Sequence, residues 1–251
     1  MCDTCGCDAA GVAAAHHDHP HAHDHPHAHD HHHSHEGVRR LELGLSVLAH
    51  NDAHAAENRA WLAQHGLPMV DLLSSPGSGK TTLLEATLDA LRDELRCGVI
   101  VGDVATDRDA QRLVGRCAAV HAIETGGACH LDATHVSGLL PALPPLDLLL
   151  VENVGNLVCP AAFDLGQGLR VALLSVTEGE DKPLKYPALF HRAPVVLLTK
   201  CDLLPHLRYS REGAVANLRQ VRPDVRVIEL SAQTGEGMGE WLALLRAQAG
   251  R

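Results

Sequence analysis

The sequence predicts an α/β fold of three layers, in which helices cover both faces of a mostly parallel sheet. Short apolar runs without polar alternation recur along the chain, and such runs are typical of parallel strands buried on both faces. Segments of helical character separate the runs, and glycine or polar residues follow them at the edge of the sheet where ligands bind. The strands are expected at residues 69–75, 98–103, 121–124, 146–155, 171–177, 194–200 and 225–231.

The chain begins with MCDTCGC, which places three thiols within one short loop. Cys2, Cys5 and Cys7 can turn onto one ion, Gly6 permits the tight turn, and the terminal amine is close enough to be a fourth ligand. A planar N,S donor set suits Ni(II) or Cu(II), whereas a tetrahedral set suits Zn. The residues alone do not choose between these metals, and a disordered tip with incidental cysteines is the alternative.

A histidine tract follows at residues 16–35, where twelve of the twenty histidines lie. The unit HDHPHA covers residues 17–22 and repeats over 23–28. Because the tract has no apolar side chain larger than Ala, it cannot fold alone, and we interpret it as a low-affinity store for several metal ions. An expression tag is the alternative, and the interspersed Asp and Pro and the internal position argue against it.

Apolar residues at helical spacing begin after residue 36 and continue to about residue 64, where Gly66 and Pro68 end the helix. The predicted organisation is therefore a disordered metal-binding tail at 1–36, a helical segment packed on the main domain at 37–66, and a nucleotide-binding domain at 67–251. Further helices are expected at 81–96 and 107–115, and another helix is expected directly after a glycine loop at 126–133.

The first strand leads directly into the sequence PGSGKTT, residues 76–82. A strand, a glycine turn and a helix in this order form a phosphate-binding P-loop, in which backbone N–H groups and the helix N-terminus hold the anion. Ser74 replaces the first glycine of the usual pattern, and a chance GSGKT is the alternative that the context opposes. The fold expected is thus that of a P-loop NTPase. The residues expected to contact the nucleotide here are Pro76, Gly77, Ser78, Gly79, Lys80, Thr81 and Thr82.

Acidic residues end two later strands, where a P-loop NTPase uses carboxylates to hold Mg²⁺ and to orient water. Lys80 should reach the β- and γ-phosphates, and the Thr81 hydroxyl should take a Mg²⁺ position. Asp103 and Glu152 can hold Mg²⁺ and orient the attacking water, so Lys80, Asp103 and Glu152 are the catalytic candidates. Gly155 can offer its N–H to the γ-phosphate. Either acid alone could equally be a solvated loop carboxylate.

Two motifs at the ends of late strands favour guanine over adenine. TKCD, residues 199–202, resembles N-K-x-D, in which Asp202 accepts two hydrogen bonds from the guanine N1–H and N2–H2 while the stem of Lys200 lies along the base. Thr199 stands where Asn is commoner. SAQTG, residues 231–235, resembles the motif whose backbone meets guanine O6, which points to Ser231 and Ala232. GTP is therefore preferred over ATP.

A second set of metal-ligating side chains comes from the loops around the fourth strand. Cys129 and His130 lie on the glycine loop, and Cys159 follows Glu152 by seven residues. Two thiolates and an imidazole suit Zn or Ni, and two copies across a dimer could share ions. Buried structural cysteines are the alternative, which is the interpretation preferred for Cys97, Cys117 and Cys201.

Composition limits the class of protein. The formal net charge of −10 argues against a nucleic-acid partner. No apolar run approaches the roughly 20 residues of a membrane span, and no signal peptide is visible. The cysteines are not spaced as a disulfide framework, so a cytoplasmic location without a membrane partner is expected.

Several segments together resemble one family: MCDTCGC, the His-rich tract, SSPGSGKTT, GDVATD, ACHLDA, ENVGNLVCP and LSVTEGEDKPLKYP. They resemble the HypB family, the SIMIBI-class GTPases of nickel incorporation in [NiFe]-hydrogenase maturation. The resemblance covers nearly the whole chain, and Ser74 is shared with the family.

The resemblance implies slow, Mg²⁺-dependent GTP hydrolysis to GDP and homodimers that depend on nucleotide and metal. It implies a tight nickel site at Cys2, Cys5, Cys7 and the amine. It also implies a nickel or zinc site at Cys129, His130 and Cys159 near the dimer interface. The implied partners are a HypA-type nickel chaperone and the hydrogenase large subunit.

The function predicted from the sequence is that of a GTP-hydrolysing nickel metallochaperone whose His-rich tail stores nickel. A nickel storage and detoxification protein is one alternative, motivated by the tract. A urease-type accessory GTPase is another, and the CxxCGC sequence and the separated Cys159 argue against it.

Overall fold

The structure is a computed structural model that describes residues 34–104 and 106–251, with side chains from Leu45 onward. The predicted tail site at Cys2, Cys5 and Cys7 and the histidines up to residue 33 lie outside the described residues. The chain divides between Val47 and Leu48 into two compact units, each of which is described by itself. Helix α1 (Ser34–Gln64) runs through this boundary.

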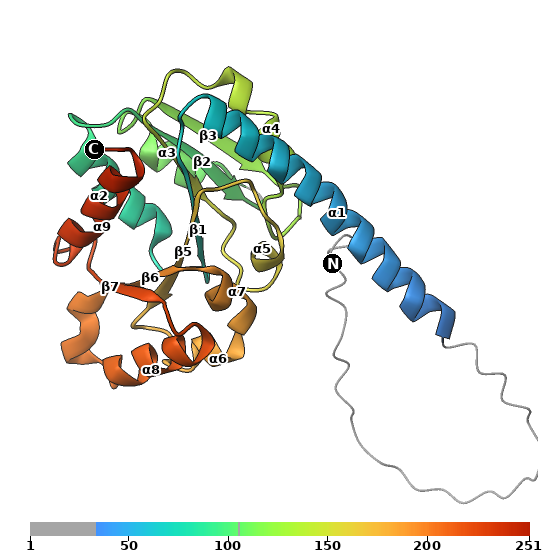
Figure 1. The fold of residues 1–251 in the computed structure, drawn as a ribbon. Helices are drawn as coiled ribbons and strands as arrows, with labels where there is room; N and C mark the ends of the chain where they lie inside the picture. The colour runs from blue at the N-terminus through green and yellow to red at the C-terminus, as the bar shows by residue number, and fades with distance from the viewer. Residues whose placement is uncertain (1–33, 105) are drawn as a thin grey trace, which may run out of the picture. The chain divides into compact units, whose positions relative to one another are not determined.

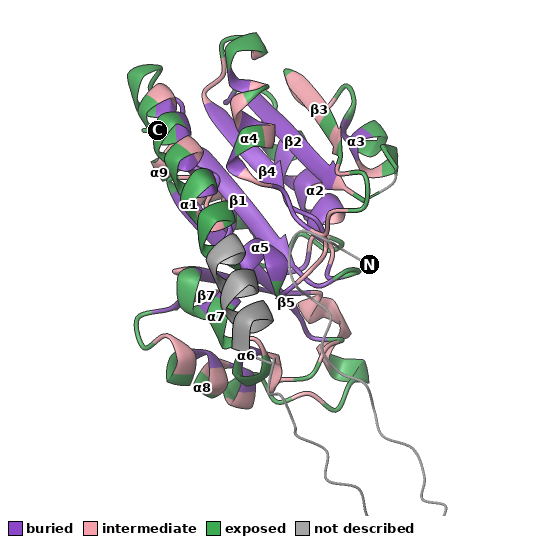
Figure 2. Ribbon diagram, turned by 90° about the vertical axis from the view of Figure 1, so that its right-hand side faces the viewer, coloured by how far each residue is buried: buried purple, intermediate pink, exposed green. Residues whose placement is uncertain are grey.

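Seven strands form one sheet in the order β3-β2-β4-β1-β5-β6-β7, and every neighbouring pair is parallel (Figure 1). The strands are β1 (Met69–Ser74), β2 (Cys97–Asp103), β3 (Ala119–Glu124), β4 (Leu148–Glu152), β5 (Leu169–Ser175), β6 (Val195–Thr199) and β7 (Arg226–Glu229). The central strands β1, β4, β5 and β6 are buried along their whole length, as their unbroken apolar runs predict (Figure 2).

Helices cover both faces of the sheet, which confirms the three predicted layers. On one face, α2, α3 and α9 pack their apolar residues against alternate strand residues such as Val70 and Leu72. On the other face, the last turns of α1 with α4 and, farther along the sheet, α5, α7 and α8 do the same. The helices that follow β1 are α2 (Lys80–Leu91), α3 (Arg108–Leu113), α4 (Ala133–Ser137), α5 (Cys159–Ala162), α6 (Lys182–Lys185), α7 (Pro187–Arg192), α8 (Arg211–Val221) and α9 (Met238–Gln248), with 3₁₀ turns at Leu140–Ala142 and Cys201–His206.

Several elements are shorter than the sequence predicts, among them the helix expected at 107–115, which is Arg108–Leu113, and the strand expected at 225–231, which is Arg226–Glu229. The helix after the P-loop ends at Leu91 rather than near residue 96, and Arg96, directly before β2, bonds the Asp147 carboxylate through its backbone N–H and its guanidinium. The strand expected at 146–155 covers only Leu148–Glu152. Asn153 ends it, because its side chain turns back to accept a hydrogen bond from the N–H of Val154.

No helix in the described part of the chain is long and apolar enough to cross a membrane.

Candidate nucleotide and metal sites

The P-loop joins β1 to α2 at the carboxyl edge of the sheet. Gly79 has φ of 96°, a left-handed conformation that favours glycine, and the loop passes directly into the first turn of α2. Ser74, in the place of the usual glycine, accepts hydrogen bonds from Lys80 Nζ at 2.9 Å and from the Ser78 hydroxyl. Burial lowers the pKa of Lys80, although the carboxylate of Glu152 opposes this shift. The lysine is therefore buried at the loop, where a polyphosphate would supply the missing counter-charge.

Thr81 and Glu152 form the part of the site that suits a divalent cation. The Thr81 hydroxyl donates to Glu152 Oε1 at 2.7 Å, and Glu152 Oε2 is buried without a hydrogen-bond partner. Burial raises the pKa of Glu152 to about 7. A hard cation on this carboxylate and hydroxyl would satisfy the orphaned oxygen, so the residues fit Mg²⁺. Asp103, at the end of β2, lines the same cavity.

The cavity above the P-loop measures about 500 Å³ and holds the catalytic candidates together. Gly155 lines it on the side of β4, and a Cβ atom there would lie 3.0 Å from the Pro76 Cα. The loop after Glu152 thus packs directly on the P-loop. The lining residues are Pro76, Gly77, Gly79, Lys80, Thr81, Thr82, Gly102, Asp103, Val104, Asp109, Arg112, Glu152, Asn153, Val154, Gly155 and Lys200.

A second, smaller pocket adjoins the P-loop and contains both guanine motifs. Thr199, Lys200, Asp202, Ser231 and Ala232 line it together. The hydroxyl of Thr199 donates to the Ser78 carbonyl at 2.8 Å, so the residue that replaces Asn still ties this motif to the P-loop. Lys200 donates to the Gly77 carbonyl at 2.6 Å from a left-handed backbone position. The predicted base-binding residues therefore share one pocket.

The Ser231 hydroxyl shapes the second guanine motif. It is fully buried and accepts hydrogen bonds from the N–H groups of Gln233 and Thr234, both at 3.2 Å. These bonds fix the turn that carries the Ala232 backbone.

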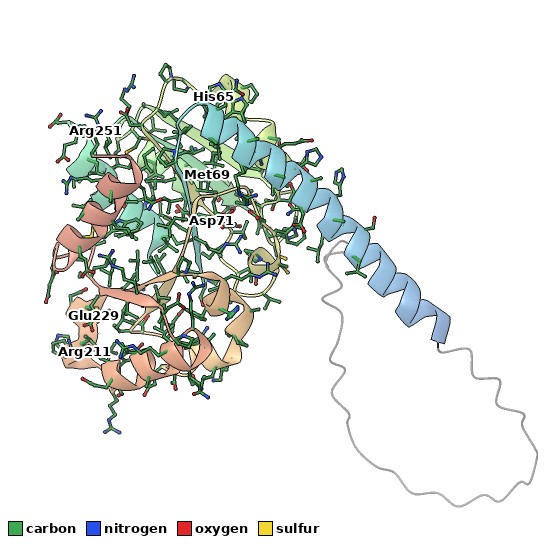
Figure 3. The ribbon with its side chains drawn as sticks, viewed as in Figure 1. His65, Met69, Asp71, Arg211, Glu229 and Arg251 are labelled. Atoms are coloured by element: carbon green, nitrogen blue, oxygen red, sulfur yellow. The ribbon has the colours of Figure 1, made fainter. Side chains whose placement is uncertain are left out.

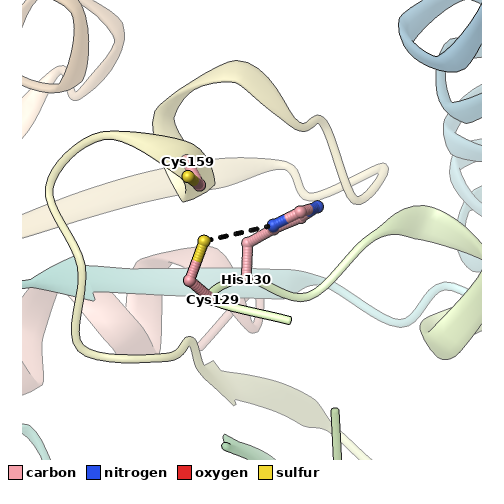
Figure 4. A group of neighbouring side chains, drawn as sticks. All are labelled: Cys129, His130 and Cys159. Carbon is pink, nitrogen blue, oxygen red and sulfur yellow. Dashed lines mark hydrogen bonds between the residues drawn. The ribbon is translucent and has the colours of Figure 1, made fainter. Parts of the chain in front are cut away.

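The metal-ligand candidates Cys129, His130 and Cys159 also come together, with their ligand atoms all within 4.8 Å of one another (Figure 4). Cys129 and His130 lie on the loop before α4, and Cys159 opens α5. Burial lowers the pKa of His130, which favours the neutral imidazole that a metal needs. The three donors thus suit a borderline ion such as Ni(II) or Zn(II).

The surroundings hold these ligands in place. The ring of Phe163 stacks on His130 with centroids 3.9 Å apart. Asp132 and His135 cap α4 reciprocally, with the Asp132 carboxylate 2.8 Å from His135 Nδ1. The hydrogen bond to His135 is the main cause that lowers the pKa of Asp132 to about 2. Both ligand-bearing segments are therefore anchored.

Three polar residues that line the cavity above the P-loop were missed by the sequence analysis. Arg112 and Asp109 come from α3, and Arg112 donates to the Thr82 hydroxyl at 3.2 Å. Asn153 lines the same cavity and is 1% exposed. Asn153 sits inside the motif ENVGN, which is a signal that could have found it, whereas the α3 residues reach the cavity only through folding.

Comparisons with known proteins identify the family of this chain. The model of the CobW/HypB/UreG nucleotide-binding domain family matches residues 68–229. A hydrogenase maturation factor HypB of Azotobacter chroococcum mcd 1 is 52% identical over 214 residues, which are 84% of this chain and 70% of that protein. The chain belongs to the HypB family. This confirms the family expected from the sequence motifs.

Two solved HypB structures share the fold. The crystal structure of the hydrogenase maturation factor HypB from Archaeoglobus fulgidus has a TM-score of 0.76 and 37% identity, covering 80% of this chain and 99% of that one. The crystal structure of HypB from Helicobacter pylori in complex with nickel has a TM-score of 0.75 and 35% identity, covering 79% of this chain and 94% of that one. These matches confirm the P-loop NTPase fold that the sequence predicts.

Proposed function

We propose that this protein is a GTP-hydrolysing nickel metallochaperone that supplies nickel to the [NiFe]-hydrogenase large subunit during maturation. The observation that carries the proposal is the pairing of two sites. A cavity with P-loop and guanine motifs lies at the same sheet edge as the Cys129–His130–Cys159 cluster, of which His130 and Cys159 are buried and Cys129 is half-buried. Membership of a hydrogenase maturation family, with a nickel complex solved for its Helicobacter pylori relative, supports nickel as the cargo.

In this proposal each site residue has a distinct task in GTP hydrolysis. The P-loop N–H groups and Lys80 hold the phosphates, and Asp202 recognises guanine. Thr81 and Glu152 would hold Mg²⁺, and Asp103 lines the same cavity. The ion would neutralise charge that develops on the phosphates. Asp103 and Glu152 orient the attacking water, and Gly155 donates its N–H to the γ-phosphate.

The metal cargo would be handled by the segment that also senses the nucleotide. One stretch of chain carries Glu152 and Gly155 at the cavity and Cys159 at the metal cluster. A shift of this stretch on loss of the γ-phosphate would change the placement of a ligand, which couples hydrolysis to binding or release of nickel or zinc. We further propose cytoplasmic homodimers that form with nucleotide and metal, with a HypA-type chaperone as partner.

Nucleotide hydrolysis tests the proposal that the protein binds guanine rather than adenine. The protein should release phosphate from GTP and not from ATP, and Asp202→Asn should lose GTP hydrolysis and gain hydrolysis of xanthosine triphosphate, which carries an acceptor at C2. Thr81→Ala should be inactive with either nucleotide. Cleavage of ATP with no cleavage of GTP would overturn the proposal.

Nickel storage is a second candidate function, favoured by the twelve histidines of residues 16–35. Deletion of residues 16–36 distinguishes the two. A delivery protein without the tract should still mature hydrogenase when nickel is ample, whereas a store should lose most of its metal capacity and its cellular value.

A further inference from the structure

Two charged side chains and one amide are buried together in the centre of the sheet. Asp71 on β1, Arg170 on β5 and Asn153 after β4 are 0%, 6% and 1% exposed. Asp71 and Arg170 face each other in the register of β1 and β5, and Figure 3 shows Asp71 in the middle of the sheet. Burying two charges is unfavourable unless they are well paired, and apolar residues in their place would often be as stable or more stable. Their presence therefore calls for a role other than stability.

Asn153 connects this group to the nucleotide cavity and to the first metal-ligand segment. Its Nδ2 donates to Asp71 Oδ1 at 3.2 Å. Its Oδ1 accepts from the Leu131 N–H at 3.2 Å and from the Val154 N–H at 3.0 Å. Leu131 follows the ligand candidate His130, and Val154 precedes Gly155 at the cavity. One amide thus bonds the nucleotide loop to the His130 segment.

Arg170 connects the same group to the second metal-ligand segment. Its Nε lies 3.4 Å from Asp71 Oδ2, and its guanidinium donates to the carbonyls of Phe163 at 2.6 Å and Ala161 at 3.4 Å. Ala161 belongs to the helix that Cys159 opens, and the Phe163 ring stacks on His130. The group formed by Asp71, Arg170 and Asn153, which an ion pair and hydrogen bonds join, therefore reaches both ligand segments and the nucleotide loop.

We propose that Asp71 and Arg170 are positioning residues that transmit the nucleotide state to the metal cluster through Asn153. The inference rests on the proposed coupling of GTP hydrolysis to metal handling. A change at the loop carrying Gly155 moves the Asn153 amide, and the Asp71–Arg170 pair passes that shift to the carbonyls after Cys159. Asp71 Oδ2 and Arg170 Nε are buried without a hydrogen-bond partner and meet as an ion pair at 3.4 Å, so a shift of either side chain changes this buried contact directly.

The test uses the full chain with Cys2, Cys5 and Cys7 changed to Ser, so that thiolate-to-Co(II) absorption does not report the tail thiols. Asp71→Leu with Arg170→Met removes both charges together, because changing one alone would leave an unpaired buried ion. Neither residue lines the nucleotide cavity or belongs to the ligand cluster. Arg192→Met is the matched control. Arg192 is exposed and donates to the carbonyls of Ala161 and Ala162 at 2.8 and 3.1 Å, so it holds the same helix from outside.

Cobalt dissociation constants are measured with GDP and with GMPPNP for each protein. The parent should show different constants in the two states. The double variant should keep its GDP value within about twofold, while the ratio between states falls at least about threefold, a size typical of residues that modulate coupling. Arg192→Met should keep the parent ratio. Arg170→Lys, which keeps the charge but loses the forked donor, should also reduce the ratio, and it decides the matter if the double variant does not fold.

An unchanged ratio in the folded double variant, or in Arg170→Lys when only that variant folds, would overturn the inference, as would an equal loss in Arg192→Met. If the parent hydrolyses GTP but binds cobalt equally with GDP and with GMPPNP, both the proposed coupling and this inference are overturned. A parent that shows the difference in binding but does not hydrolyse GTP would leave the inference standing and overturn the proposed enzymatic function.

Discussion

At the scale of single residues, many polar side chains of the site hold backbone in place. Ser74 donates to the Ser75 carbonyl, Ser231 fixes its own turn, and Thr199 donates to the Ser78 carbonyl at 2.8 Å. Thr199 is the clearest case, because its hydroxyl is buried and joins the guanine motif to the P-loop across more than a hundred residues of sequence. The substitution from the commoner Asn is thus compatible with base binding.

Removing this hydroxyl should weaken nucleotide binding. We expect Thr199→Ala to raise the dissociation constant of GDP about fivefold to tenfold, since a lost buried hydrogen bond costs about 1 kcal/mol or somewhat more. Thr199→Ser keeps the hydroxyl and should bind within about twofold of the parent, on the same scale. Fluorescence titration with a labelled GDP measures both. Equal binding by the Ala variant would show that the bond to Ser78 is not needed.

The Asp132–His135 cap should make stability depend on pH. Asp132 raises the pKa of His135 in the folded state, so the stabilisation is fully present below the unfolded pKa of about 6.5 and is lost as pH rises through the folded value. Asp132, with a pKa of about 2, stays ionised throughout. Urea unfolding of His135→Ala should therefore show a larger loss at pH 5.5 than at pH 8.5, by less than about 1 kcal/mol because the pair is partly exposed.

His135→Gln is the control, because Gln at this position can still complete the capping box without a charge. Its loss of stability should be smaller than that of the Ala variant because the cap remains, but it should grow by a similar amount from pH 8.5 to pH 5.5, because Gln also lacks the titrating charge. A loss that stays constant with pH in both variants would assign the pH dependence to another group.

At the scale of elements, the second half of α1 holds the two metal-ligand segments together. Asn51 donates to the Asp164 carbonyl and accepts from the Ala133 N–H, both at 2.9 Å. Asn58 donates to the carbonyls of Ala133 and Leu165. Ala133 follows His130 in the chain, and Asp164 and Leu165 follow Cys159. Helix α1 therefore bonds both of the loops that carry the candidate ligands.

We expect Asn58→Ala to lower the free energy of unfolding by about 2–4 kcal/mol, because it removes three buried or half-buried hydrogen bonds, to the carbonyls of Ala133 and Leu165 and from the Ser137 hydroxyl. The neighbouring Arg59→Ala removes only a half-exposed ion pair with Asp164 at 2.7 Å, and its effect should stay within about 0.5 kcal/mol. Denaturant unfolding compares the two. Similar small losses in both would mean that α1 does not anchor these loops.

At the scale of the whole molecule, the nucleotide cavity lies among segments that are distant in sequence. The P-loop, the ends of β2 and β4 and the base motifs after β6 and β7 meet at one edge of the sheet. A ligand that bridges them should stabilise the fold as a whole, because it binds the native and not the unfolded chain.

GDP at a hundred times its dissociation constant should add about 2.7 kcal/mol to the free energy of unfolding. The thermal midpoint should rise with GDP, and ADP at the same concentration should leave it nearly unchanged. Lys80→Ala should lose most of the shift, because the phosphates lose their buried cation. An equal rise with ADP would contradict the guanine assignment.

The amino-acid sequence alone predicts the parallel sheet, the P-loop and the loops that carry Cys129, His130 and Cys159. Unbroken apolar runs can be satisfied only by burial on both faces, and motifs of fixed local spacing act through the backbone around them. It did not determine where the 146–155 strand ends or that Arg112 and Asp109 reach the cavity, because those outcomes depend on side chains that meet only after folding.

The tertiary structure also decided which polar residues act together. Asp71 and Arg170 stand as single charges in apolar strands, a signal visible in the sequence, but nothing in their spacing says that they pair. The order β4-β1-β5 places those two strands side by side, and it brings Asn153 to the same point. Strand order is set by packing of the entire chain, which is why this link between the two sites could be found only in the fold.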